Sequence, residues 1–142
     1  METKEKTKIT IAATVNASVD TVWKKWTNPT DIMKWNNASD DWHTPHAEND
    51  VRVGGKFLST MAAKDGSVSF DFVGTYTNVK VNELIEYTMG DSRTASIIFT
   101  NEGTHTKIVI TFEAEEENSI ELQQGGWQAI LNNFKKHVES NS

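Results

Sequence analysis

The chain contains no cysteine among its 142 residues. This absence excludes disulfide bonds, thiolate nucleophiles and cysteine-based zinc sites. The sequence also lacks any apolar run long enough for a membrane helix, and its start, METKEKTKIT, lacks the apolar core of a signal peptide. We therefore expect a cytoplasmic protein with no membrane partner.

Basic charge is scarce as well. Fourteen lysines and arginines stand against twenty acidic residues, which gives a formal net charge of −6. Surplus positive charge is what holds a phosphate backbone, so no nucleic-acid partner is expected. Length and composition are typical of one globular core. We expect residues 1–142 to form a single domain in which residues 1–7 fray.

The first part of the chain alternates between strand and helix periodicity. Apolar residues at every second position predict a strand, followed by a helix over Val19–Thr27 with Ser18 as its N-cap. Asn28 and Pro29 predict the start of a second, short helix. The polar stretch 36–49 is predicted to be mainly loop, with at most a brief strand around Trp42.

The rest of the chain is rich in strands and ends in a long helix. The predicted strands are Lys56–Ala62, Ser67–Val79, Glu83–Met89, Ala95–Thr100 and Thr106–Phe112. Short turns containing Asp-Gly and Glu-Gly favour an antiparallel sheet. A helix over about 119–139 is predicted to start at a capping box of Asn118 and Glu121, and its apolar stripe is the only one that can cover the curved sheet. The fold class is therefore α+β.

The segment Gly54-Gly55-Lys56 invites comparison with nucleotide-binding loops. A P-loop requires a glycine where this chain has Asp50 and a serine or threonine where it has Phe57. A dinucleotide fingerprint would open a helix, whereas a strand follows here. The glycines are therefore predicted to serve backbone geometry, as a bend with positive φ or a close approach of two chain segments.

No catalytic residue, cofactor or metal site is predicted. Candidate metal ligands cluster in one polar stretch, namely Asp40, Asp41, His43, His46, Glu48 and Asp50. His-x-x-His across a proline is not a recognised metal spacing, so a solvated loop is preferred. His105 and His137 show no evident carboxylate to orient them, and no G-x-S-x-G motif occurs.

Several motifs together resemble a known family. They are VWKKWTNPTDIMKW, DVRVGGKF, GTYTNVKVNELIEYTM and GWQAILNNFKKHV, spread over about Lys8 to Glu139. This combination resembles the activator of heat-shock-protein-ninety ATPase homologue family, in the START-like, birch-pollen-allergen-like superfamily. The resemblance implies a helix-grip fold, in which a curved antiparallel sheet wraps a long C-terminal helix and two short helices follow the first strand.

The resemblance also implies a cavity between the sheet and the last helix. Sheet residues expected to line it are Phe57, Met61, Phe70, Phe72, Tyr87 and Met89, and helix residues are Trp127, Ile130, Leu131 and Phe134. The first hypothesis is a non-enzymatic protein that binds a small apolar ligand, as a monomer or homodimer. The alternatives are a surface that modulates a chaperone partner and a cyclase or hydrolase. A filled core also stays open, because sequence does not give side-chain volumes in place.

Overall fold

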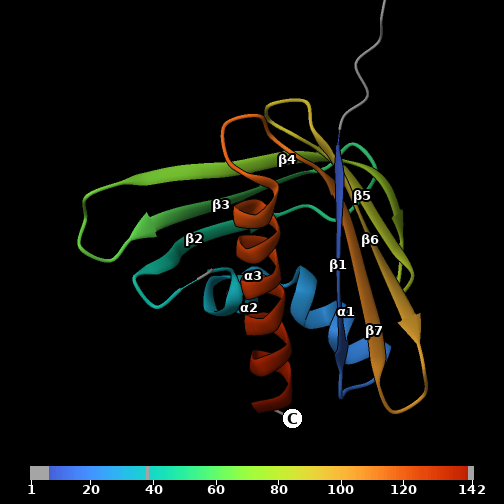
Figure 1. The fold of residues 1–142 in the computed structure, drawn as a ribbon. Helices are drawn as coiled ribbons and strands as arrows, with labels where there is room; N and C mark the ends of the chain where they lie inside the picture. Colours follow the sequence, from blue (N-terminus) through green and yellow to red (C-terminus); the bar gives the residue numbers. More distant parts are fainter. Residues whose placement is uncertain (1–6, 38, 141–142) are drawn as a thin grey trace, which may run out of the picture.

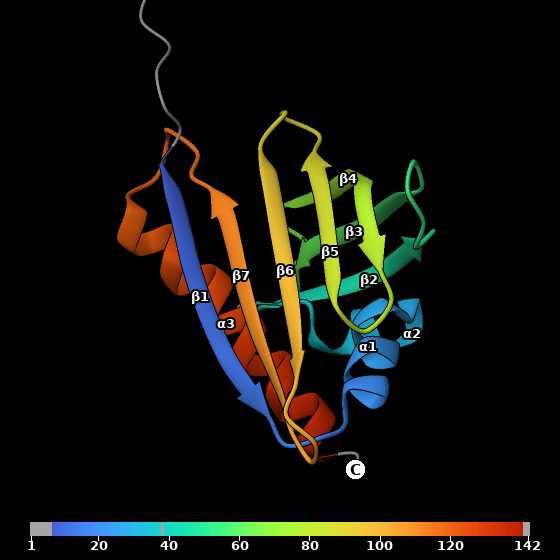
Figure 2. The ribbon, with the colours of Figure 1, turned by 90° about the vertical axis from the view of Figure 1, so that its right-hand side faces the viewer.

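The protein forms one curved antiparallel sheet that wraps around a long helix (Figures 1 and 2). The computed structural model describes residues 7–37 and 39–140. The strands are β1 (Lys8–Val15), β2 (Trp42–Asn49), β3 (Lys56–Ala63), β4 (Ser69–Lys80), β5 (Leu84–Met89), β6 (Thr94–Asn101) and β7 (Thr106–Glu113). The helices are α1 (Val19–Thr27), α2 (Pro29–Trp35) and α3 (Ile120–Ser140).

The strand order is β1-β7-β6-β5-β4-β3-β2, and every neighbouring pair is antiparallel. Helices α1 and α2 follow the first strand, as predicted. The α+β, helix-grip fold class is therefore confirmed. None of the helices formed by the described residues has the length and apolar character needed to cross a membrane.

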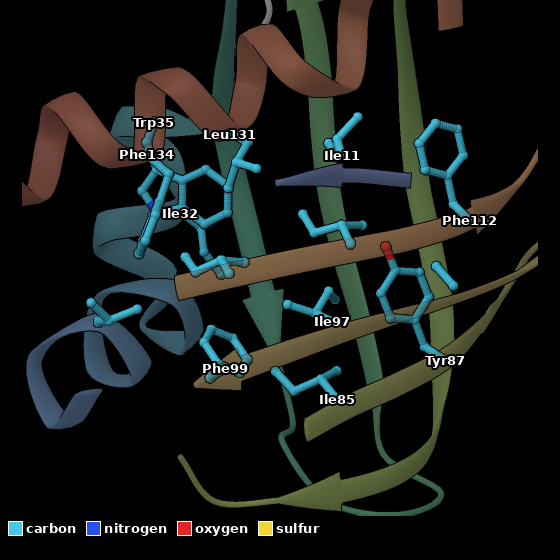
Figure 3. Close-up of a cluster of buried hydrophobic side chains, with 14 of the residues drawn as sticks. Ile11, Ile32, Trp35, Ile85, Tyr87, Ile97, Phe99, Phe112, Leu131 and Phe134 are labelled. Carbon is cyan, nitrogen blue, oxygen red and sulfur yellow. The ribbon is translucent and has the colours of Figure 1, made fainter. Parts of the chain in front are cut away.

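Pairing between strands aligns the alternating apolar residues on the concave face of the sheet. Ile11 lies opposite Ile110, which in turn lies opposite Ile97, so one row of isoleucines crosses three strands. All three side chains are buried. Figure 3 shows Ile11 and Ile97 among the side chains that lie between the sheet and Leu131 and Phe134 of α3. The core therefore lies between the sheet and this helix, as the strand periodicity requires.

The prediction of a loop over 36–49 was wrong, because β2 occupies Trp42–Asn49 and pairs with β3. The register shifts between His43 and His46, on either side of Pro45. This irregularity breaks the alternation by which a strand is recognised in sequence, and an edge strand tolerates a proline. The buried Thr44 hydroxyl donates a hydrogen bond to the Asn36 carbonyl at 2.6 Å, which fixes the entry into β2.

The predicted helix caps were correct in one case of three. Asn28 accepts a hydrogen bond from the Thr30 amide at 3.0 Å and caps α2 as expected. Ser18 makes no cap bond to the backbone of α1. At α3 the Ser119 hydroxyl accepts from the Leu122 amide at 3.1 Å, so Ser119 takes the place predicted for Asn118.

The two adjacent glycines act as a bend, as predicted. Gly54 has a φ of +84°, and a Cβ on Gly55 would lie 2.0 Å from the Asp50 carbonyl oxygen. The Gly54 amide donates to the Tyr76 carbonyl at 2.8 Å, and the Tyr76 amide donates to the Gly55 carbonyl at 2.9 Å. The bend is thereby joined to β4.

The prediction of a frayed segment over 1–7 stays a prediction. Residues 1–6 lie outside the described part of the chain. The Thr7 carbonyl accepts a hydrogen bond from the Ala114 amide at 2.7 Å, so pairing with the end of β7 begins one residue before β1.

Candidate ligand-binding pocket

A pocket with a volume of about 330 Å³ lies between the concave face of the sheet and α3. Its wall combines β2 to β7, the middle of α3 from Trp127 to Leu131, and side chains of α1 and α2. Most of the lining is aromatic or aliphatic, as expected for residues on the inner face of a half-buried sheet. The fold therefore leaves room at the place where the resemblance implied a cavity.

The structure brings together eight of the ten residues expected to line this pocket. They are Phe57, Met61, Phe70, Phe72, Tyr87, Trp127, Ile130 and Leu131. Met89 and Phe134 are buried but are not part of the lining. That the eight contact a ligand stays a prediction.

Phe134 lies outside the pocket because other aromatic rings surround it. Its ring centroid is 4.8 Å from that of Trp26 and 5.0 Å from that of Trp35, both edge-to-face. Figure 3 shows the rings of Phe134 and Trp35 together. The Trp35 indole nitrogen also donates to the Lys25 carbonyl at 3.0 Å, which holds α2 against α1. This cluster fills one end of the space between sheet and helix, since aromatic rings pack densely in this geometry.

The opposite end is shaped by two close ring contacts. Trp127 stacks on Phe112 with centroids 3.8 Å apart and an interplanar angle of 8°. Phe57 lies over Gly74, where an added Cβ would approach the Phe57 Cζ atom to 2.4 Å. Gly74 therefore provides the space for the Phe57 ring. The rings of Phe57 and Trp127 both form part of the pocket wall.

Polar side chains also line the pocket, and sequence reasoning missed all of them. They are Asn36, Glu48, Asn49, Ser59, Tyr76, Arg93 and Glu115. Two of them are joined by a hydrogen bond, which the Tyr76 hydroxyl donates to Asn49 Oδ1. Asn49 Nδ2 in turn donates to the Thr27 carbonyl at 2.8 Å. Ser59 could have been found from its place between Phe57 and Met61, whose alternate positions face inward.

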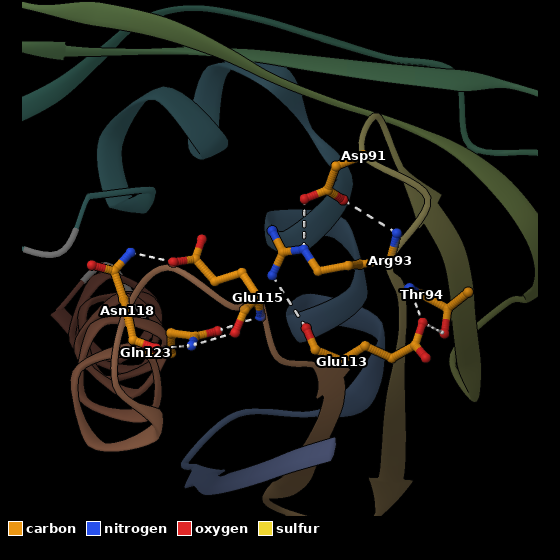
Figure 4. Close-up of polar contacts among 7 residues, drawn as sticks. All are labelled: Asp91, Arg93, Thr94, Glu113, Glu115, Asn118 and Gln123. Atoms are coloured by element: carbon orange, nitrogen blue, oxygen red, sulfur yellow. Dashed lines mark hydrogen bonds and ion pairs between the residues drawn. The ribbon is translucent and has the colours of Figure 1, made fainter. Parts of the chain in front are cut away.

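A polar network borders the pocket near the start of α3 (Figure 4). Arg93 Nε donates to Asp91 Oδ2 at 2.7 Å, and Arg93 Nη1 donates to the Glu113 carbonyl at 3.2 Å. The Glu115 amide donates to Gln123 Oε1 at 2.8 Å, which ties the preceding connection to the helix. Both pocket residues of this network, Arg93 and Glu115, are therefore held by neighbours.

The two tyrosines of the lining remain neutral. Burial raises the pKa of Tyr76 and of Tyr87 well above the usual value of 10, because a buried phenolate loses its hydration. Both hydroxyls therefore stay protonated at neutral pH. They can donate or accept hydrogen bonds, whereas neither can act as a base at that pH.

The histidines depart from the prediction that they lack a carboxylate partner. His137 Nε2 lies 2.9 Å from Asp31 Oδ1 and links α3 to α2, and His105 Nε2 lies 3.6 Å from Glu102 Oε1. Asp31 is 106 positions away in the chain, so no sequence pattern could have revealed this contact. Within the described part of the chain, no group of three or more His, Asp or Glu side chains could hold a metal ion.

A curved antiparallel sheet gripping a long C-terminal helix, with a pocket between them, defines the START-like, helix-grip class of proteins. Residues 16–139 match the family described as Activator of Hsp90 ATPase homolog 1-like protein. The chain belongs to this family. A comparison with curated protein sequences gave no match.

Solved structures agree with this assignment. The chain is similar to the AHSA1-like protein from Aeromonas hydrophila, with 43% identity, a TM-score of 0.89 and coverage of 95% of this chain and 94% of the other. A protein from Cytophaga hutchinsonii is 57% identical, with a TM-score of 0.81 and coverage of 94% and 93%. A protein from Nitrosomonas europaea, at 17% identity, a TM-score of 0.80 and coverage of 94% and 95%, shares the fold.

Proposed function

We propose that this protein binds a small, mostly apolar molecule in the pocket beside α3. The observation that carries the proposal is a cavity of about 330 Å³ with a mainly apolar lining and a few polar groups. Ligand pockets typically have volumes of about 300–1,000 Å³ and this same mixture of surfaces. The proposed contacts are Phe57, Met61, Phe70, Phe72, Tyr87, Trp127, Ile130 and Leu131.

Native mass spectrometry of the purified protein tests the proposal, because it can detect a molecule that stays bound and also reads the oligomer mass. We expect a small molecule to copurify with the chain. In keeping with the sequence-based expectation, we propose that the protein acts in the cytoplasm as one domain, as a monomer or homodimer.

A matched pair of variants tests the position of the molecule. Ser59→Leu adds a large side chain to the pocket lining, whereas Ser96→Leu makes the same change on the outer face of β6. We expect Ser59→Leu to lose the copurifying molecule and Ser96→Leu to retain it. Equal retention by both variants would overturn the proposed position.

Family membership favours a second candidate, a surface that modulates a heat-shock chaperone. This function would need no pocket, so Ser59→Leu would leave it intact. Pull-down and ATPase assays with the host's own chaperone test it. Absence of binding together with absence of stimulation would remove this candidate.

A third candidate is an enzyme of the cyclase or hydrolase type. Such an enzyme is expected to hold a polar group with a shifted pKa inside the pocket. Tyr76 and Tyr87 are polar groups with raised pKa values, but this direction favours hydrogen bonding over proton abstraction. The raised pKa values of the two tyrosines therefore support ligand binding better than catalysis by a tyrosine base.

A further inference from the structure

The Tyr87 hydroxyl is a buried polar group that has no partner in the described part of the chain. Tyr87 is only 8% exposed, lines the pocket and packs edge-to-face on Phe57 at 4.8 Å. Every fully buried side-chain nitrogen and oxygen of the described residues has a hydrogen-bond partner. The Tyr87 hydroxyl, which has none, is therefore not fully buried, and it points from β5 toward α3, the side on which Tyr87 lines the pocket (Figure 3). A ligand atom that forms a hydrogen bond with an unpaired hydroxyl in such a place lowers the free energy of the complex.

Arg93 supplies a second donor at the same end of the pocket. Tyr87 lies opposite Ala95, and the Met89 amide donates to the Arg93 carbonyl at 2.7 Å. Tyr87 and Arg93 are therefore diagonal neighbours on one face of the sheet, about 7–8 Å apart, which long side chains can span. Nε and Nη1 of Arg93 have protein acceptors, whereas Nη2 has none among the described residues (Figure 4).

The charges around these donors select the kind of group they can bind. Arg93 is neutralised by Asp91 at 2.7 Å, and Glu115, whose carboxylate accepts a hydrogen bond from Asn118, belongs to the same pocket wall. A carboxylate on the ligand would approach an Arg93 charge that Asp91 already balances and a pocket wall that includes Glu115, which raises its free energy relative to a neutral group. A neutral carbonyl oxygen accepts from both donors and adds no charge to a mostly apolar site.

We infer that the bound molecule carries an uncharged carbonyl oxygen, which accepts hydrogen bonds from the Tyr87 hydroxyl and the Arg93 guanidinium. Its apolar body packs against Phe57, Phe72 and Trp127. This inference rests on the proposed function, since it names the chemical class of the ligand for the same pocket.

Three rigid probes of nearly equal shape test the inference. They are 9-fluorenone, fluorene, which lacks the carbonyl oxygen, and fluorene-9-carboxylate, which carries a charge. Titration of the isotope-labelled protein, followed by amide chemical shifts, measures each affinity. We expect 9-fluorenone to bind about tenfold more tightly than fluorene, the ratio expected for one or two net hydrogen bonds. The carboxylate should bind less tightly than either.

Two variants locate the effect. Tyr87→Phe removes only the hydroxyl and keeps the ring in its place, so the preference for 9-fluorenone over fluorene should fall at least threefold. Ser96→Ala removes a hydroxyl from the outer face of the sheet and should keep the tenfold preference. A preference unchanged by Tyr87→Phe would overturn the inference.

The remaining outcomes separate this inference from the proposed function. Equal binding of 9-fluorenone and fluorene to the wild-type protein, or tighter binding of the carboxylate, would overturn the carbonyl inference and leave the apolar pocket supported. Binding of none of the three probes would overturn the proposed function, and the inference with it.

Discussion

The two halves of α3 meet the sheet in different ways. In the second half, Phe134 and Val138 are 0% exposed and the space around Phe134 is filled by the tryptophans of α1 and α2. In the first half, Trp127 and Ile130 are only partly buried and border the pocket. The same apolar stripe thus packs tightly in the core at one end and lines the pocket at the other. Stability is expected to depend mainly on the second half, and ligand binding on the first.

The largest expected effect comes from removing an aromatic side chain of the packed half. Phe134→Ala should lower the free energy of unfolding by about 3–5 kcal/mol, because it removes a fully buried ring and leaves a cavity. Urea denaturation measures this change. Phe72→Ala, the same substitution at a partly buried pocket position, should cost less than half as much. Equal costs would contradict the proposed division of the helix.

The next effect concerns the shape of the pocket itself. Gly74→Ala should lower the free energy of unfolding by about 1–3 kcal/mol, because the new methyl group displaces the Phe57 ring. The displaced ring should also change the affinity for apolar probes. Denaturation and probe titration measure the two effects. An unchanged stability would show that Phe57 does not need the space above Gly74.

A smaller effect of opposite sign is expected in the first half of α3. Gly125 lies within the helix, and an added Cβ would meet no atom within 4 Å. Gly125→Ala should therefore raise the free energy of unfolding by about 0.5–1 kcal/mol, through higher helix propensity. Thermal unfolding measures the change. A lower melting temperature would indicate that the helix is not regular at this position.

The smallest effect concerns the polar network at the pocket end and depends on pH. Burial acts to raise the pKa of Asp91, but hydrogen bonds from Arg93 outweigh burial and hold that pKa below its usual value of 3.8. A depressed pKa contributes stability above the unfolded-state pKa, and this contribution is lost as the pH falls through the folded-state pKa.

Asp91→Asn should therefore lower the free energy of unfolding at pH 7 by about 0.2–1 kcal/mol, the range for exposed ion pairs. The difference from wild type should shrink as the pH falls below about 4, where the wild-type carboxylate becomes protonated. Urea denaturation at several pH values measures it, with Asp40→Asn, an exposed position outside this network, as the control. A difference that does not vary with pH would rule out the ion pair as its cause.

Much of the fold could be predicted because its signals are local. Helix α1 has the predicted bounds Val19–Thr27, and the strands after Gly55 were placed within two residues. Strand β2 was missed because the irregularity between His43 and His46 hides its alternation. The contact between His137 and Asp31 was missed because it depends on how two distant helices pack.

The candidate site was predictable only in part, for the same reason. Apolar lining residues follow from alternation along strands and from the helix stripe, so eight of the ten predicted residues border the pocket. Arg93 follows a turn of the chain, and its pocket position depends on the pairing of β5 with β6. Whether a residue such as Met89 or Phe134 faces a cavity depends on neighbours that the local pattern does not contain.

By itself, the sequence determined the periodicities of this protein, and through them the class of fold and the inward faces of its strands and last helix. Only the tertiary structure decided that Phe134 is enclosed by rings while Trp127 borders open space. The physical reason is that periodicity specifies the direction of a side chain, whereas a cavity depends on the volumes that remote segments bring to the same place.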